Sequence, residues 1–230
     1  MDKTSLGNRH KDNYEKRAQT YLYRRIPVLM RLDGVCFHTF TRGMERPYDY
    51  PMHTNMRETA RYLCTRIQGA QLAFVQSDEI TILITDFNKL TTDAWYNYNA
   101  QKMCSVAGGW ASSYMSLAYG EIVALDCRVW NCPRHEVANN FVWRQKDWHR
   151  NSVQMLAQAN FSHKELHKKN QPMMHDMLHE IGINWNDGES WQKNGSIVQR
   201  TEEGWTIPKE TPIFTENRAL IEDLLIPEEE

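Results

Sequence analysis

The apolar segments of the first 132 residues follow one another in an order that few folds allow. Four short apolar runs predict strands, at 28–33, 72–78, 79–84 and 123–129. Two longer segments between them have helical periodicity, at 52–67 and 94–117. The resulting order is strand, helix, strand, strand, helix, strand, which is the ferredoxin-like βαββαβ arrangement and also the layout of a polymerase palm. We therefore predict an α+β fold with a palm-like core.

The second half of the chain is predicted to be mainly helical. Its expected helices lie at 133–159 and within 164–181, and a late pair of short strands is possible near 195–198 and 205–207. A chain of 230 residues suits one large domain. We expect a catalytic core with an N-terminal helix over residues 1–132, and additional C-terminal helices over residues 133–230 that pack on the same core.

Composition places the chain among ordinary soluble globular proteins. Apolar residues make up 41% and charged residues 24%. No apolar run approaches the length that spans a bilayer, and the first residues lack a hydrophobic signal region, so we expect no membrane association. The five cysteines are odd in number and scattered, which favours reduced thiols in a cytoplasmic protein.

The charge balance limits the kind of nucleic-acid partner. The formal net charge is −2, which is unusual for a protein that binds bulk nucleic acid. Local patches matter more than the total, however. Two basic clusters could either contact phosphates or form solvated faces: Arg57, Arg61 and Arg66 in one, and Lys164, Lys168 and Lys169 in the other.

Two of the predicted strand ends carry acidic residues. Asp33 ends the first strand, and Asp78 and Glu79 lie where the second strand meets the third. An Asp-Gly pair is often only a turn, but several acids at adjacent strand ends repel one another unless cations neutralise them. Mg²⁺ suits such a site because it prefers oxygen ligands and needs few carboxylates. We predict a site for two magnesium ions that uses Asp33, Asp78 and the carbonyl of Gly34.

The segment that follows the first strand is suited to a triphosphate. Backbone amides from Gly34 to His38 could form an anion-binding nest. In a two-metal mechanism, one cation activates an attacking hydroxyl and the other stabilises the pyrophosphate leaving group. The pattern therefore favours nucleotidyl transfer over hydrolysis.

Several separated motifs resemble the tRNA-His guanylyltransferase family and, more closely, its bacterial- and phage-type branch of guanylyltransferase-like 3′-5′ polymerases. The motifs are Arg31-Leu32-Asp33-Gly34-Val35-Cys36-Phe37-His38, Gln76-Ser77-Asp78-Glu79, Ala111-Ser112-Ser113-Tyr114, the run 143–151, and shorter runs at 168–170, 182–187 and 192–195. Their order along roughly residues 5–198 makes the resemblance specific, although each motif alone would be weak.

The resemblance implies a magnesium-dependent nucleotidyltransferase that adds nucleotides to the 5′ end of tRNA in the 3′-5′ direction. Addition would prefer GTP or follow a template, and the reaction would serve tRNA 5′-end repair. It implies activation of a 5′-monophosphate by ATP, attack by the 3′-hydroxyl of GTP, and release of pyrophosphate. The implied assembly is a homotetramer, and the implied cofactor is a pair of Mg²⁺ ions.

The resemblance also implies a role for individual residues. The catalytic residues would be Asp33, Asp78, Glu79, His149 and Lys169. The nucleotide-binding residues would be Asp33, Gly34, Val35, Cys36, Phe37, His38, Ser77, Asp78 and Asn184. The metal ligands would be Asp33, Gly34 and Asp78. Lys168 competes with Lys169 as the activating lysine, and the residues after His149 depart from the family's usual continuation, as is typical of the polymerase-like branch.

Two other functions remain open from the sequence. A nucleotide cyclase of the same palm architecture would act on a small molecule, but it would not need the motif at 143–151 or the lysines at 168 and 169. A non-catalytic RNA-binding module with structural magnesium is the second alternative. The acidic balance argues mildly against that module, because nonspecific affinity for RNA comes from neutralising phosphates.

Overall fold

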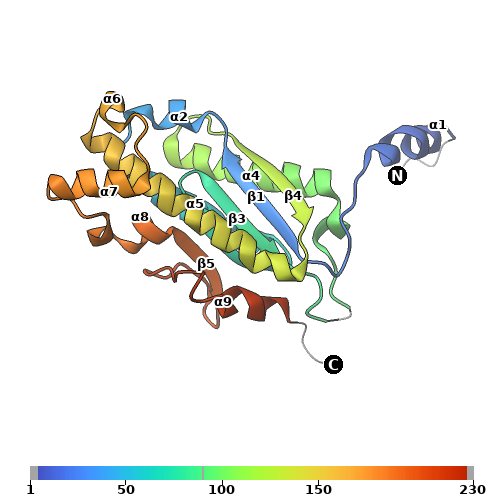
Figure 1. Cartoon of the computed structure of the whole chain (residues 1–230). Helices are drawn as coiled ribbons and strands as arrows, with labels where there is room; N and C mark the ends of the chain where they lie inside the picture. Colours follow the sequence, from blue (N-terminus) through green and yellow to red (C-terminus); the bar gives the residue numbers. More distant parts are fainter. Residues whose placement is uncertain (1–4, 90, 227–230) are drawn as a thin grey trace.

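A six-stranded antiparallel sheet forms the centre of the computed structural model, which describes residues 5–89 and 91–226 (Figure 1). In sheet order the strands are β4 (Leu125–Asn131), β1 (Val28–Gly34), β3 (Glu79–Ile84), β2 (Ala70–Gln76), β5 (Ser196–Thr201) and β6 (Gly204–Thr206). The first four have the strand order and connectivity of a ferredoxin-like βαββαβ unit. The predicted α+β fold is therefore confirmed.

Helices pack against both faces of the sheet. The longer ones are α3 (Tyr50–Arg66), α4 (Ala100–Tyr119), α5 (Arg134–Asn160) and α7 (Gln171–Glu180). The shorter ones are α1 (Ser5–His10), η1 (Lys11–Glu15), η2 (Lys16–Ala18), α2 (Phe37–Phe40), η3 (Thr41–Gly43), η4 (Trp95–Tyr98), α6 (His163–Leu166), η5 (Trp185–Asp187), α8 (Ser190–Asn194), α9 (Ala219–Glu222) and η6 (Asp223–Leu225). In Figure 1, α5 crosses the front of the sheet and α4 lies behind it, while α1 extends away from the body.

The second half of the chain also contributes strands to the sheet. The expected hairpin forms between β5 and β6. In addition, β5 pairs with β2, with Phe74 opposite Ile197, and so extends the four-stranded core. The apolar alternation of a strand does not reveal its partner, which is why this pairing was not predicted. The division of the chain at residue 132 stays a prediction.

Alternation along β1 divides the apolar core between the two faces. Met30 and Leu32 are buried against the side that carries α3 and α4. Leu29 is buried on the other side, in a cluster with Phe141 of α5 and with Phe214. Because side chains two residues apart share a face, the odd-numbered residues of β1 point to the side that α5 crosses. The acid that ends the strand, at position 33, belongs to that side.

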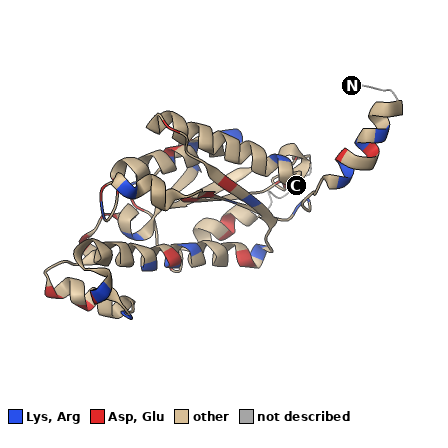
Figure 2. Ribbon diagram, turned by 90° about the horizontal axis from the view of Figure 1, so that it is seen from above, with Lys and Arg blue, Asp and Glu red and all other residues tan. Residues whose placement is uncertain are grey.

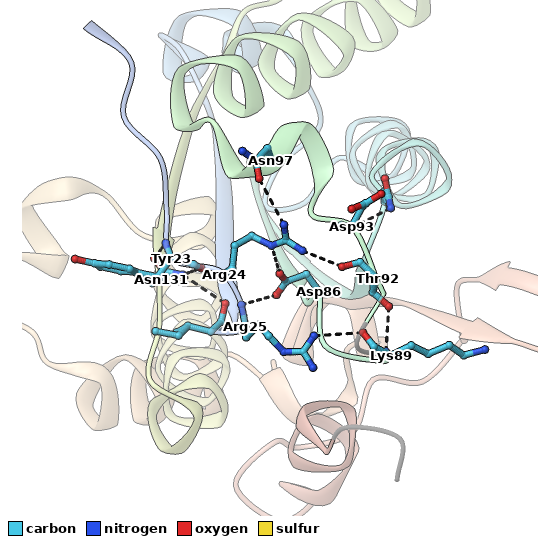
Figure 3. Close-up of polar contacts among 11 residues, drawn as sticks. Tyr23, Arg24, Arg25, Asp86, Lys89, Thr92, Asp93, Asn97 and Asn131 are labelled. Carbon is cyan, nitrogen blue, oxygen red and sulfur yellow. Dashed lines mark hydrogen bonds and ion pairs between the residues drawn. The ribbon is translucent and has the colours of Figure 1, made fainter. Parts of the chain in front are cut away.

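The buried carboxylate of Asp86 holds the segment that leads into β1. Its Oδ2 accepts a hydrogen bond from Arg24 Nε at 2.5 Å, and its Oδ1 accepts one from the backbone N–H of Arg25 at 2.9 Å (Figure 3). Arg24 also donates through Nη2 to the carbonyl of Thr92 at 2.9 Å. These bonds tie the chain before β1 to the loop that follows β3.

Replacing Asp86 with alanine should destabilise the fold. The change leaves Arg24 without its carboxylate and the N–H of Arg25 without its acceptor. Removing one partner of a buried ion pair costs roughly 3–5 kcal/mol, and the partial exposure of Arg24 places the expected loss near the lower end. Chemical denaturation measures it. Asp12→Ala, which breaks an exposed pair with Lys16, is the control and should leave the unfolding midpoint unchanged; equal effects of the two substitutions would contradict the assigned role.

A buried histidine links α3 to the added strand β5. Nε2 of His53 lies 2.9 Å from the hydroxyl of Ser196, and the imidazole stacks on Trp191 with 4.4 Å between ring centroids. Burial lowers the pKa of His53 from 6.5 to about 3, and the nearby guanidinium of Arg57 adds to this effect. The imidazole is therefore neutral in the folded protein at ordinary pH.

Stability should fall as the pH drops below the ordinary pKa of histidine. The unfolded chain takes up a proton on His53 near pH 6.5, whereas the folded chain does not until about pH 3. The unfolded state thus binds more protons in this range, and the folded state loses about 2 kcal/mol between about pH 7 and pH 5. Urea denaturation at both pH values measures the loss. His53→Gln should remove this part of the pH dependence and the exposed-site control His135→Gln should keep it; an unchanged slope in His53→Gln would refute the assignment.

Candidate active site

The acids predicted to bind metal meet at one end of the sheet. Ser77 and Asp78 form the two-residue turn between β2 and β3, and Ser77 has a left-handed φ of 47°. The N–H of Gly34 donates to the carbonyl of Asp78 at 3.1 Å, which fixes the end of β1 to this turn. In the sheet register, Asp33 lies opposite Glu79 on β3. Asp33 and Asp78, which are 45 residues apart in the sequence, are thereby brought to one place.

Asp33, Asp78 and Glu79 line a cavity of about 440 Å³. The other wall comes from one face of α5, with Arg144, Trp148, Asn151, Gln154, Met155 and Gln158. The wall therefore combines amide, aromatic and cationic groups opposite the acids. A cavity of this size and polarity suits a small polar ligand with charged oxygens.

Glu79 differs from the two aspartates because a protein cation neutralises it. Arg144 binds it through two hydrogen bonds, from Nε to Oε1 at 2.8 Å and from Nη2 to Oε2 at 2.7 Å. Nη2 of Arg144 also lies 3.2 Å from Asp147. Within the described part of the chain, neither Asp33 nor Asp78 has an ion-pair partner. The two aspartates are the acids that remain for a bound cation.

The electrostatics of Asp78 favour a cation. Burial raises the pKa of its carboxyl above the ordinary value, and the nearby charges of Asp33 and Glu79 raise it further. Hydrogen bonds from its own backbone and from Ser77 act in the opposite direction. A raised pKa means that the protein alone stabilises the carboxylate poorly. A bound cation would supply the missing stabilisation.

The donor set fits Mg²⁺ better than zinc. Among residues 5–89 and 91–226, no three His, Cys, Asp or Glu side chains form a complete metal site. Structural zinc needs four protein ligands and catalytic zinc usually three, whereas Mg²⁺ binds through one or two carboxylates and takes water and phosphate oxygens for the rest. Asp33 and Asp78 together with a backbone carbonyl match that requirement.

Two side chains of the cavity wall bury a polar atom that has no hydrogen-bond partner among the described residues, Oε1 of Gln76 and Nε1 of Trp148. Nε of Arg31 on β1 and Oδ1 of Asp126 on β4 are two further such atoms, in side chains outside the cavity wall. Such atoms are costly to bury and are rare in folded proteins. A polar ligand in the cavity would give the atoms of Gln76 and Trp148 a partner.

The loop after β1 is shaped by the absence of a side chain at Gly34. A Cβ at this position would lie 2.1 Å from Cδ2 of Phe37, because the buried ring of Phe37 packs directly on the glycine. Cys36 adopts a left-handed φ of 57° and precedes the short helix α2. The backbone of Val35 donates to the carbonyl of Ala124 at 2.9 Å. The predicted phosphate-binding segment is therefore a fixed loop beside Asp78.

A second cavity of about 390 Å³ shares Ser77, Met155 and Gln158 with the first. His38, which is exposed, lies on its wall, and so do Met44 and Met52, which add apolar surface. The two cavities are thus neighbours, and the loop from 34 to 38 leads from one to the other.

Three residues that the resemblance assigned lie away from the acids. His149 has Nε2 3.1 Å from Oδ1 of Asn194, and burial lowers its pKa. Asn184 accepts a hydrogen bond from the N–H of Asn186 and begins η5. Lys169 is exposed after α6. None of the three belongs to the wall of the cavity that contains Asp33 and Asp78, and their roles stay predictions.

Of the two candidate lysines, Lys168 lines a cavity next to the candidate site. This third cavity, of about 400 Å³, is also lined by Arg46, His163 and His167. This cavity shares two residues of α5, Gln154 and Gln158, with the first cavity. The basic cluster predicted around 164–169 therefore borders the candidate active site through Lys168.

Sequence reasoning missed most of the wall that α5 supplies. A usable signal was present, because Arg144, Trp148, Asn151, Met155 and Gln158 follow the three- and four-residue spacing of one helix face. Arg144 lies within the motif at 143–151, but the motif does not indicate its partner. Its partner Glu79 lies 65 residues away, and no local pattern reveals such a pairing.

The comparison with known families decides the identity. Residues 8–137, more than half of the chain, match the family described as tRNAHis guanylyltransferase. The chain belongs to this family. Members of the family are nucleotidyltransferases, and this protein is an enzyme of that class. The resemblance drawn from the motifs is confirmed.

Solved structures and curated relatives agree with this assignment. A bacterial tRNA(His) guanylyltransferase-like protein in complex with ATP is 41% identical, with a TM-score of 0.91 and coverage of 96% of this chain and 99% of that one. A structure of such a bacterial protein in complex with GTP is 38% identical, with a TM-score of 0.87 and the same coverage, 96% and 99%. The tRNA(His) guanylyltransferase of Saccharomyces cerevisiae is 24% identical over 202 residues, which cover 76% of this chain and 83% of that protein.

The helices give no sign of a membrane span. Among the described residues, none combines the length and the apolar character that crossing a bilayer requires.

Replacing Gly34 with alanine should disrupt the loop that follows β1. The new methyl group would overlap the ring of Phe37, and relief of such overpacking typically costs about 1–3 kcal/mol. We expect a lower unfolding midpoint in thermal melts and at least tenfold weaker GTP binding by calorimetry. Gly43→Ala, in the same loop region, is the matched control because nothing lies within 4 Å of its added carbon. Similar behaviour of both variants would contradict the proposed contact.

Proposed function

We propose that this enzyme adds nucleotides to the 5′ end of tRNA in the 3′-5′ direction, with two Mg²⁺ ions as cofactor. The observation that carries the proposal is the cavity in which Asp33 and Asp78, which have no ion-pair partner among the described residues, lie beside a fixed loop. ATP would activate a 5′-monophosphate, GTP would be a preferred or templated substrate, and pyrophosphate would be released. Family membership and the likeness to proteins that bind ATP and GTP support it.

In this proposal the acids bind the cations and the loop after β1 orients the triphosphate. Asp33 and Asp78 with the carbonyl of Gly34 would hold the cations, which supply charge neutralisation and lower the pKa of the attacking hydroxyl when bound. The backbone from Gly34 to His38 would orient the triphosphate. Arg144 would balance the charge of Glu79 through their ion pair, so that the third acid does not compete for the cations. Catalysis would rest mainly on positioning and charge.

The second cavity is a candidate site for the nucleoside. It lies next to the loop, and its wall includes His38, Met44, Met52 and Met155. Methionine side chains adapt to flat apolar ligands, and an exposed imidazole can stack on a base or bind a ribose hydroxyl. A triphosphate over Asp78 would then place its base between α2 and α5.

The same proposal includes a repair role for tRNA 5′ ends, a homotetramer and a cytoplasmic location, all implied by the family. Of the alternatives left open by the sequence, a non-catalytic RNA-binding module conflicts with membership in an enzyme family. A palm-fold cyclase is less favoured, because the likeness to the guanylyltransferase-like proteins extends over both halves of the chain.

Replacing either aspartate with asparagine should abolish nucleotide addition without unfolding the protein. Asp33→Asn or Asp78→Asn removes a charge that neutralises the cations, and we expect activity to fall on the order of 100-fold or more. Because burial and neighbouring acids disfavour the Asp78 carboxylate, Asp78→Asn should melt at the same temperature as the parent or higher. Glu58→Gln, on an exposed part of α3, is the charge-matched control and should be fully active.

The assay supplies 5′-truncated, 5′-monophosphorylated tRNA with ATP and each nucleoside triphosphate, and the extended ends are sequenced. Unreduced activity in either aspartate variant would refute the site. A cyclic product from GTP alone would favour the cyclase, and tRNA binding without pyrophosphate release would favour a non-catalytic module.

A further inference from the structure

Two arginines face each other on the sheet next to the acids. In the register of β1 and β4, Arg31 lies opposite Arg128, and the next pair on the same face is Asp33 opposite Asp126. Cross-strand partners point to the same side of a sheet. The arginine pair and the acid pair therefore form consecutive rows on the face that α5 crosses.

The two arginines are not equally satisfied by the protein. Arg128 donates from Nη2 to Oδ2 of Asp126 at 2.9 Å. Arg31 has its guanidinium 5.9 Å from the ring of Trp130, and its Nε is buried without a hydrogen-bond partner among the described residues. Like charges directly opposite each other destabilise a sheet, and the unmet buried donor of the half-buried Arg31 adds to that cost. An anion bound between the arginines would relieve both penalties.

This part of the sheet is accessible from solvent. β4 is the edge strand, and the side chain of Arg128 is 53% exposed. Figure 1 shows α5 crossing the front of the sheet, and Figure 2 shows an acidic and a basic position close together on a strand of the sheet. An extended anionic chain could therefore reach the arginine row along the sheet edge.

We propose that Arg31 and Arg128 bind backbone phosphates of the RNA substrate and hold its end over the cavity that contains Asp33. This inference rests on the proposed function. Planar guanidinium groups suit phosphate oxygens because they donate two parallel hydrogen bonds. The row lies two strand residues from Asp33, about 7 Å along β1, which is close enough for one RNA strand to contact both.

The geometry favours RNA over the nucleoside triphosphate as the occupant. The expected triphosphate loop begins at Gly34 and leads to the second cavity, in the direction of the chain after β1. Arg31 lies on the other side of Asp33, back along the strand. In two-metal phosphoryl transfer the attacking and leaving groups lie on opposite sides of the reacting phosphorus, so the second substrate is expected on the arginine side.

The test measures binding of 5′-monophosphorylated tRNA by fluorescence anisotropy at several salt concentrations between about 50 and 200 mM. Arg31→Gln and Arg128→Gln should each weaken binding by roughly 3- to 10-fold and reduce the slope of log Kd against log salt by about one. Arg31→Lys keeps the charge and should retain most of the slope. GTP affinity without RNA, measured in the same proteins, should stay unchanged in all three.

Arg200→Gln is the control, since it also removes one arginine but lies on β5, which three strands separate from β4 in the sheet. Its affinity and salt slope should equal those of the parent. Parent-like slopes in Arg31→Gln and Arg128→Gln would overturn the inference, as would a loss of GTP affinity that places the arginines in the nucleotide site. Failure of the parent protein itself to bind tRNA would contradict the proposed function instead.

Discussion

The register of β1 against β3 and β4 determines which acids lie together at the candidate site. It places Asp33 between Glu79 and Asp126, so that three acids stand in one row across three strands. A slip of β1 by one residue would turn Asp33 toward the face packed on α3 and α4. Burial prevents the slip, because Met30 and Leu32 fill the core on that opposite face. The same packing that stabilises the fold thus keeps mutually repelling charges together.

The protein compensates only part of this repulsion. Glu79 is paired with Arg144 through two short hydrogen bonds, and that ion pair in turn contacts Asp147. Asp33 and Asp78 are left without such partners among the described residues, and burial, together with the charges of Asp33 and Glu79, raises the pKa of Asp78. Leaving charges unpaired lowers stability but preserves affinity for a cation, which is the usual conflict between stability and activity at functional sites. Glu79 therefore has a structural role as the partner of Arg144, whereas Asp33 and Asp78 remain available to a cation.

Local sequence patterns were sufficient for the order of strands and helices and for the position of Asp33 and Asp78, because apolar runs and the polar residues that end them are properties of short segments. Pairings between distant segments were beyond reach. The addition of β5 to the sheet and the contact between Arg144 and Glu79 both join parts of the chain that no short pattern connects. His149 illustrates a different limit: a motif located it on α5, but only the structure shows that it contacts Asn194 instead of the acids.

The charge distribution also explains how a chain with a net charge of −2 can belong to a family that acts on tRNA. Nonspecific affinity for RNA scales with the number of phosphates neutralised. Most of the surface of a weakly acidic protein therefore contributes little to RNA binding. Here, two arginines lie opposite each other beside the acids: Arg31, whose Nε has no hydrogen-bond partner among the described residues, and Arg128, which pairs with Asp126. Cations bound to Asp33 and Asp78 would make this edge still more attractive to phosphate. Attraction confined to the reaction centre would favour an RNA end held there over RNA bound elsewhere on the molecule.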